Sequence, residues 1–202
     1  MDINDVRAKI IVMADKVYEM LCLVEKGFME NKSEPLSQAM RVEDDINDME
    51  KSMTRNILEI SRSSTVESER KGLVAIQQTV ETLERMGDEA ASLIERIEIK
   101  VAEKLLFSDS GVVQYNETYH AMQRSVDMMR QFLSKKDNTL KDKIIDNGFH
   151  VKELVERYRK EHTERLLKGL CTPMGANMYF DMLDFTGNLA RHSSSIVKTY
   201  DQ

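Results

Sequence analysis

The sequence contains few of the residues that turn or cross-link a chain. Of its 202 residues only Pro35 and Pro173 are proline, and eight are glycine. An all-β fold has many short strands and needs frequent turns, so this scarcity argues against one. The two cysteines, Cys22 and Cys171, lie far apart, and neither belongs to a Cys-x-x-Cys pair. This usage excludes a disulfide framework and is typical of a reducing compartment.

Long apolar runs and basic runs are also missing. No stretch approaches the roughly 18 apolar residues that a membrane-spanning helix requires, and the opening MDINDVRAKI is charged where a signal peptide is apolar. The formal net charge is −6 and no segment is rich in Lys and Arg, so we expect no nucleic-acid partner. We therefore expect a soluble chain without direct membrane insertion, whose acidic surface suits cations or basic partner surfaces.

The residues that are present favour long amphipathic helices. Hydrophobic residues make up 41% of the chain and charged residues 32%, which suits helices with one buried and one solvated face. We predict an all-α chain of six helices, over about 3–30, 33–61, 67–106, 112–133, 139–168 and 173–200. The third is expected to begin at Ser64-Thr-Val-Glu67, a capping box, and the fifth to stop at Gly169.

The third helix has a regular apolar seam. The seam advances in steps of three and four: Leu73, Ile76, Val80, Leu83, Gly87, Ala90, Ile94, Ile97 and Val101. Such a period of 3.5 predicts packing at shallow crossing angles.

The seam of the third helix recurs in the sixth at a shift of 100 residues. The recurring positions are Phe180, Leu183, Gly187, Ala190, Ser194 and Val197, with Leu, Gly and Ala in register. The second and fifth helices correspond more loosely, Ile46 with Val151. The repeat predicts a six-helix bundle of two pseudo-symmetric three-helix halves, residues 1–106 and 112–202, joined by a loop at 107–111. The small residues Gly87 and Gly187 are expected to let two helices approach closely.

Two pairs of carboxylates stand out for their spacing. Glu84 and Asp88 lie four residues apart, as do Asp44 and Asp48 on the preceding helix. Residues at this spacing share a helix face, and like charges there repel unless a cation offsets them. If the two helices are neighbours, the four carboxylates form one patch that suits a hard or borderline metal ion. The alternative is an ordinary solvated acidic face.

Motifs for catalysis are weak. A di-iron bundle needs two inward Glu-x-x-His motifs, and the chain has one match, Glu117 with His120, which we interpret as chance. His162 is expected to offset charge on the fifth helix, and His192 to lie on a helix surface. Neither a nucleophile motif nor a phosphate-binding loop occurs.

The segment Leu83-Glu-Arg-Met-Gly-Asp-Glu-Ala90 resembles the signature of the PhoU family, whose members regulate phosphate uptake. The duplicated three-helix plan agrees with it over essentially the whole chain. The resemblance implies a metal cluster, with a divalent or iron cation, at Asp44, Asp48, Glu84 and Asp88. The second half departs from the pattern, because Asn188 replaces the second carboxylate while Asp184 is retained.

A narrower resemblance concerns the last 50 residues. The segments 158–169 and 179–184, with His162, Arg165 and Gly169, resemble the cytosolic C-terminal PhoU-like part of bacterial sodium/phosphate cotransporters. This implies a cytoplasmic location at the inner membrane and a membrane phosphate transporter as partner, in cis or in trans.

The resemblance predicts a non-catalytic regulator of phosphate transport, with a homodimer as a further option. Two other interpretations stay open: a metal-dependent enzyme or metal store on a carboxylate-rich bundle, and a plain helical interaction module. The metal content of the purified protein separates the regulator and the metal-dependent enzyme or store from the plain interaction module.

Overall fold

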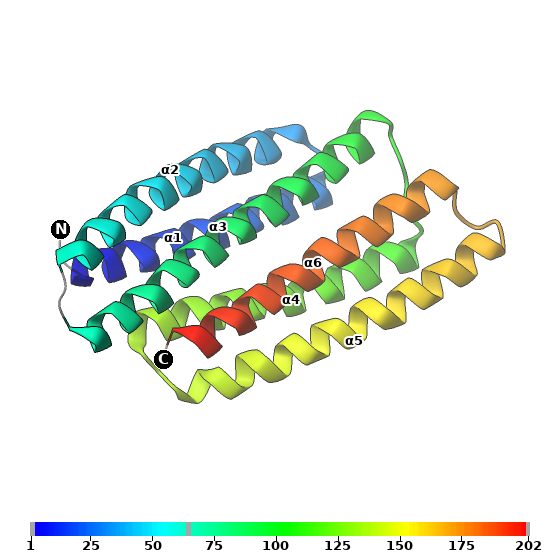
Figure 1. The fold of residues 1–202 in the computed structure, drawn as a ribbon. Helices are drawn as coiled ribbons and strands as arrows, with labels where there is room; N and C mark the ends of the chain where they lie inside the picture. Colours follow the sequence, from blue (N-terminus) through cyan, green and yellow to red (C-terminus); the bar gives the residue numbers. More distant parts are fainter. Residues whose placement is uncertain (1–2, 64–65, 201–202) are drawn as a thin grey trace.

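The computed structural model is a bundle of six long helices (Figure 1). It describes residues 3–63 and 66–200. The helices are α1 (Ile3–Glu30), α2 (Ser33–Ser63), α3 (Glu67–Ala102), α4 (Asp109–Lys135), α5 (Thr139–Leu167) and α6 (Pro173–Thr199). Over these described ranges no strand occurs, so the all-α prediction is confirmed. Within the same ranges, none of the helices combines the length and the apolar character needed to cross a bilayer.

The contacts between helices divide the bundle into equivalent halves. In each half the three helices all touch one another, α1 with α2 and α3, and α4 with α5 and α6. The halves meet where α1 packs on α4 and α3 packs on α6, while α2 and α5 lie at opposite outer edges (Figure 1). Each half alone would leave an apolar face in water, and this pairing buries both.

The core follows the seams that the sequence shows. The α3 residues Val80, Leu83 and Ile97 are fully buried, as is Leu183 of α6. Where the halves meet near the loop between α3 and α4, aromatic rings cluster, with Phe28 and Tyr115 centroids 4.9 Å apart. Heptad positions therefore decide which side of each helix is buried and which side is free for function.

Helix ends depend on local capping. The α5–α6 turn is as predicted: Gly169 has a φ of 70°, and the Thr172 hydroxyl accepts a hydrogen bond from Gly175 N at 3.1 Å. The α3–α4 junction is earlier than predicted, because the Ser108 hydroxyl accepts from Gly111 N at 3.2 Å and starts α4 at Asp109. The predicted capping box includes Ser64, which lies outside the described residues.

Candidate functional site

The contact between α2 and α3 decides which side chains line the acidic face. Gly87 of α3 lies against Ile46 of α2, where an added β-carbon would be 3.4 Å from Ile46 Cγ2. Glu84 and Asp88 each follow a buried seam residue by one position, so they emerge beside the seam. Glu84 is half-buried and Asp88 is exposed. The close approach predicted for Gly87 is therefore present, with a carboxylate pair at its edge.

Glu84 lies in an electrostatically unfavourable place for a carboxylate. Its pKa is raised, first by burial, then by the charges of Asp88 and Glu50 and a hydrogen bond with Asp88; Arg85 acts in the opposite direction. Three acidic side chains from two helices thus influence one another, and either a proton or a cation would relieve the repulsion.

The structure does not bring Asp44 and Asp48 to this pair. A helix turns about 100° per residue, so both residues point roughly away from Ile46, which lies two positions from each. Both are exposed. Asp48 lines a cavity of 470 Å³ on the α1 side together with Lys16, and its nearest ion-pair partner is Lys51, with Nζ 3.9 Å from Oδ1.

These positions limit what a metal ion could find here. Across residues 3–63 and 66–200, no group of three or more His, Cys, Asp or Glu is placed to hold a metal ion. The residues predicted as one four-carboxylate patch are instead two pairs on different faces. These four carboxylates therefore do not converge on one metal cluster.

The side of α2 that does face α3 carries other acids, which the sequence analysis did not select. Glu43 is 8% exposed and accepts a hydrogen bond from Asn47 Nδ2 at 2.6 Å. Glu50 accepts from the Thr54 hydroxyl at 2.8 Å, and Gln77 of α3 donates to that hydroxyl at 3.0 Å. A helical projection centred on Ile46 would have indicated these positions, because each lies within about one turn of it on the same side.

The equivalent face of the second half is different in charge. Gly187 lies against Val155, with a β-carbon position 3.4 Å from Val155 Cγ2. Val155, not Val151, is therefore the counterpart of Ile46, one turn further along α5 than predicted. On this face Asp184 is paired with Arg159, and Asn188 Nδ2 donates to Glu89 at 3.1 Å. The acidic pair of the first half is not repeated.

The Glu-x-x-His match does not form a joint site. Glu117 accepts a hydrogen bond from the Tyr158 hydroxyl, whereas His120 Nε2 lies 2.6 Å from Glu25 Oε1. The two side chains bind different helices, as expected for a match by chance.

Two histidines are buried, and for His192 this contradicts the prediction of a surface position. His162 is 2% exposed and stacks on Tyr179 at a centroid distance of 4.1 Å, and its Nδ1 lies 2.9 Å from Arg165 Nη2. His192 is 8% exposed, and its Nε2 lies 3.8 Å from Glu89. Burial lowers the pKa of each to about 4, with nearby arginines adding to the effect. His192 is thus not a surface residue, because the α3–α6 contact covers it.

Comparison with known proteins agrees with this architecture. The PhoU domain family matches residues 10–97. PhoU of Pseudomonas aeruginosa has a similar structure, with a TM-score of 0.91 and 19% identity over 98% of this chain and 94% of that one. The phosphate transport system regulatory protein PhoU of Streptococcus pneumoniae gives a TM-score of 0.85 and 13% identity, covering 98% and 92%. No curated protein sequence gave a match.

The fold is the six-helix bundle seen in these PhoU structures. More particularly, residues 10–97 match the PhoU domain family, and the chain resembles PhoU proteins in fold over nearly its whole length.

Proposed function

We propose that this chain regulates a membrane phosphate transporter by binding to it, and that it turns over no substrate. The observation that carries the proposal is the PhoU domain at residues 10–97 within a chain that has the PhoU fold throughout. One protein of this fold is described as a phosphate transport system regulatory protein.

The geometry suits docking. The seams are packed shut, so the distinctive groups lie on outer faces, where charge complementarity gives partner specificity. Glu84 and Asp88, with Glu50 nearby, form such a face between α2 and α3. A cation held there would change the sign of the local field and so could switch docking. Glu84 and Asp88 are its expected ligands, since Asp44 and Asp48 lie elsewhere on α2.

The partner is expected at the cytosolic side of the inner membrane, either as a separate protein or as another part of the same polypeptide. The likeness of segments 158–169 and 179–184 to the cytosolic C-terminal part of sodium/phosphate cotransporters supports attachment in cis. Sequence upstream in the full gene decides between the two arrangements. Sedimentation of the purified chain decides whether it forms a homodimer.

The alternative of a metal-dependent enzyme or metal store is less favoured. It needs a converging set of metal ligands, and the described residues do not contain one.

The experiment that tests the proposal is deletion of this chain in cells, followed by phosphate uptake measured over a range of external phosphate. We expect uptake to stop responding normally to external phosphate, and re-expression of the chain to restore the response. An unchanged uptake curve in the deletion strain would reject the proposal.

A further inference from the structure

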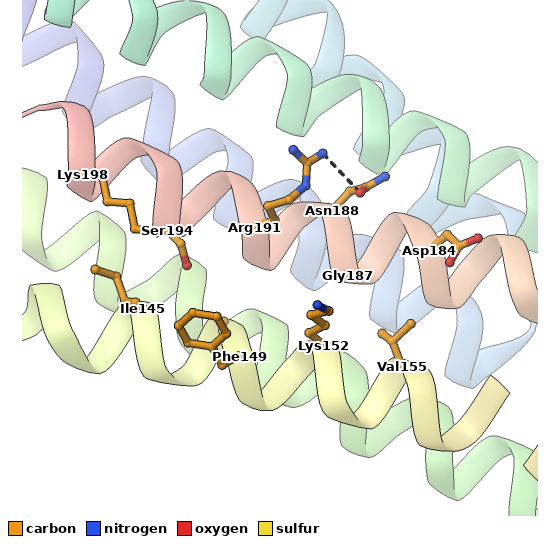
Figure 2. A pocket seen from close by; sticks show the side chains of 11 residues that line it. Ile145, Phe149, Lys152, Val155, Asp184, Gly187, Asn188, Arg191, Ser194 and Lys198 are labelled. Carbon is orange, nitrogen blue, oxygen red and sulfur yellow. Dashed lines mark hydrogen bonds between the residues drawn. The ribbon is translucent and has the colours of Figure 1, made fainter. Parts of the chain in front are cut away.

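A cavity of 580 Å³ opens between α5 and α6 in the second half (Figure 2). Its volume is within the range of about 300–1,000 Å³ that is usual for small-molecule sites. Apolar walls come from Ile145, Phe149 and Val155 of α5, and Gly187 and Ser194 of α6 line the opposite side. The cavity thus combines an apolar wall with small residues that leave room for a ligand.

The residues that line this groove differ in size from their counterparts in the first half. In the register set by Gly87 with Ile46 and Gly187 with Val155, the counterpart of Ser194 is Ile94. Ile94 is 1% exposed and fills its own helix junction. Ser194 is shorter, and its hydroxyl lies 3.4 Å from the carbonyl oxygen of Ile144 on α5, at the edge of the cavity.

The groove is basic on an acidic protein. Lys152, Arg191 and Lys198 line it, against the one carboxylate of Asp184, so its formal charge is three minus one, or +2. The chain as a whole carries −6. Two charges beside the lining cancel each other, because Arg159 pairs with Asp184 and Glu156 Oε1 lies 3.8 Å from Lys152 Nζ. An anion near this groove therefore meets a positive local field.

The duplication supplies an internal comparison for this charge. When α5 is aligned with α2 at a shift of 109 residues, Lys152 corresponds to Glu43. When α6 is aligned with α3 at a shift of 100 residues, Lys198 corresponds to Glu98. Asn188 likewise stands where the first half has Asp88. The glycine contacts are kept between the halves while the charge of the face is reversed. Helix packing therefore does not require these cations, which leaves them available for a role in binding.

An exposed aromatic ring lies beside the cations. Phe149 is 62% exposed and projects from α5 toward α6, with Lys152 one turn along the same helix (Figure 2). Phenylalanine is usually buried, and an exposed ring offers a flat surface on which another ring can stack. The groove thus presents one surface for an aromatic group and, next to it, ammonium groups for an anion.

We propose that the α5–α6 groove binds an aromatic phosphate of mononucleotide size, with its ring on Phe149 and its phosphate at Lys152 and Lys198. This site is separate from the acidic α2–α3 face, and the proposal goes beyond regulation of transport. It can be tested on the purified chain without any transporter.

The test is isothermal titration of the folded 202-residue chain with AMP, with adenosine and inorganic phosphate as separate arms. We expect saturable binding of AMP to one site, with adenosine and phosphate each at least roughly 10-fold weaker, since each makes only one of the two contacts. Phe149→Ala and Lys152→Glu should each weaken AMP binding by about 10-fold or more. Leu58→Ala and Lys51→Glu change an exposed apolar residue and an exposed lysine on α2, and they should leave the affinity unchanged.

Three results would overturn the proposal: no saturable binding of AMP, an AMP affinity unchanged in both groove variants, or phosphate binding as tightly as AMP. Thermal melts of each variant show that the chain is folded in every titration. Because phosphate uptake is not measured, failure here leaves the proposed regulatory function untouched.

Discussion

The Tyr119 hydroxyl donates a buried hydrogen bond to the carbonyl oxygen of Leu21 at 2.8 Å, and so ties α4 to α1 across the junction of the two halves. Burial raises the pKa of Tyr119, so the hydroxyl keeps its proton and remains a donor. The bond is buried, whereas the contact of His120 with Glu25 between the same two helices is exposed.

Tyr119→Phe should therefore destabilise the bundle modestly. The ring and its packing are kept while the hydrogen bond is lost, so we expect the free energy of unfolding to fall by about 1 kcal/mol. Urea denaturation followed by circular dichroism measures this difference. A variant as stable as the parent would show that the bond contributes nothing to joining the halves.

Two glycines should respond in opposite ways to alanine. At Gly27 an added β-carbon would lie 2.4 Å from Cδ2 of the buried Leu36, so Gly27→Ala should cost about 1–3 kcal/mol through overpacking. At Gly72 in α3 no atom lies within 4 Å of the added carbon. Gly72→Ala should stabilise the chain by about 0.5–1 kcal/mol, because alanine loses less backbone entropy in a helix. Thermal melts of both variants compare them, and equal effects would contradict the packing described for α1 and α2.

His162 should make the stability depend on pH. Its pKa is about 4 in the folded chain and about 6.5 when unfolded, so the fold favours the neutral ring. Its contribution is complete above pH 6.5 and is lost as the pH falls from 6.5 toward 4, where the unfolded chain alone takes up the proton. This difference in pKa corresponds to a decrease of at most about 3 kcal/mol in the free energy of unfolding.

His162→Gln removes this group, so its free energy of unfolding should fall less steeply between pH 6.5 and 4 than that of the parent. His192, whose pKa is also lowered to about 4, still contributes to the slope of the single variant. Urea denaturation at several pH values gives both slopes. If they are identical, the buried neutral state of His162 is not what links stability to pH.

The helices could be predicted from the sequence because their seams are local patterns. The seam from Leu73 to Val101 is enough to assign α3 and its buried side, and the Gly87 and Gly187 match indicates the repeat. The start of α4 was missed because it depends on which of several polar residues caps the helix, and Ser108 does.

The acidic face was only half predictable. Glu84 and Asp88 adjoin seam residues whose burial is evident, but α2 offers acids at 43, 44, 45, 48 and 50. Spacing alone selects Asp44 and Asp48, whereas the orientation of Ile46 selects Glu43 and Glu50. The burial of His162 and His192 could not be predicted from one helix, because it arises from neighbouring helices that the sequence pattern does not place.

The acidic face should be dispensable for folding. Glu84→Lys with Asp88→Lys reverses two charges that lie at the edge of the seam, where ion pairs contribute little to stability. The new lysines also lie near Glu50, so repulsion is replaced by attraction. We expect the double variant to melt at or slightly above the parent temperature. A large drop in melting temperature would mean that these carboxylates support the fold.

The most direct test of the regulatory function is phosphate uptake in cells that carry this Glu84→Lys and Asp88→Lys chain. The matched control is Asp142→Lys with Asp146→Lys, an exposed pair on α5 with the same spacing and the same change in charge. With both variants folded and equally expressed, uptake across external phosphate concentrations should be altered by the first and unchanged by the second. Unchanged uptake in the folded Glu84 and Asp88 variant would contradict the account and leave the α2–α3 face as a merely solvated surface.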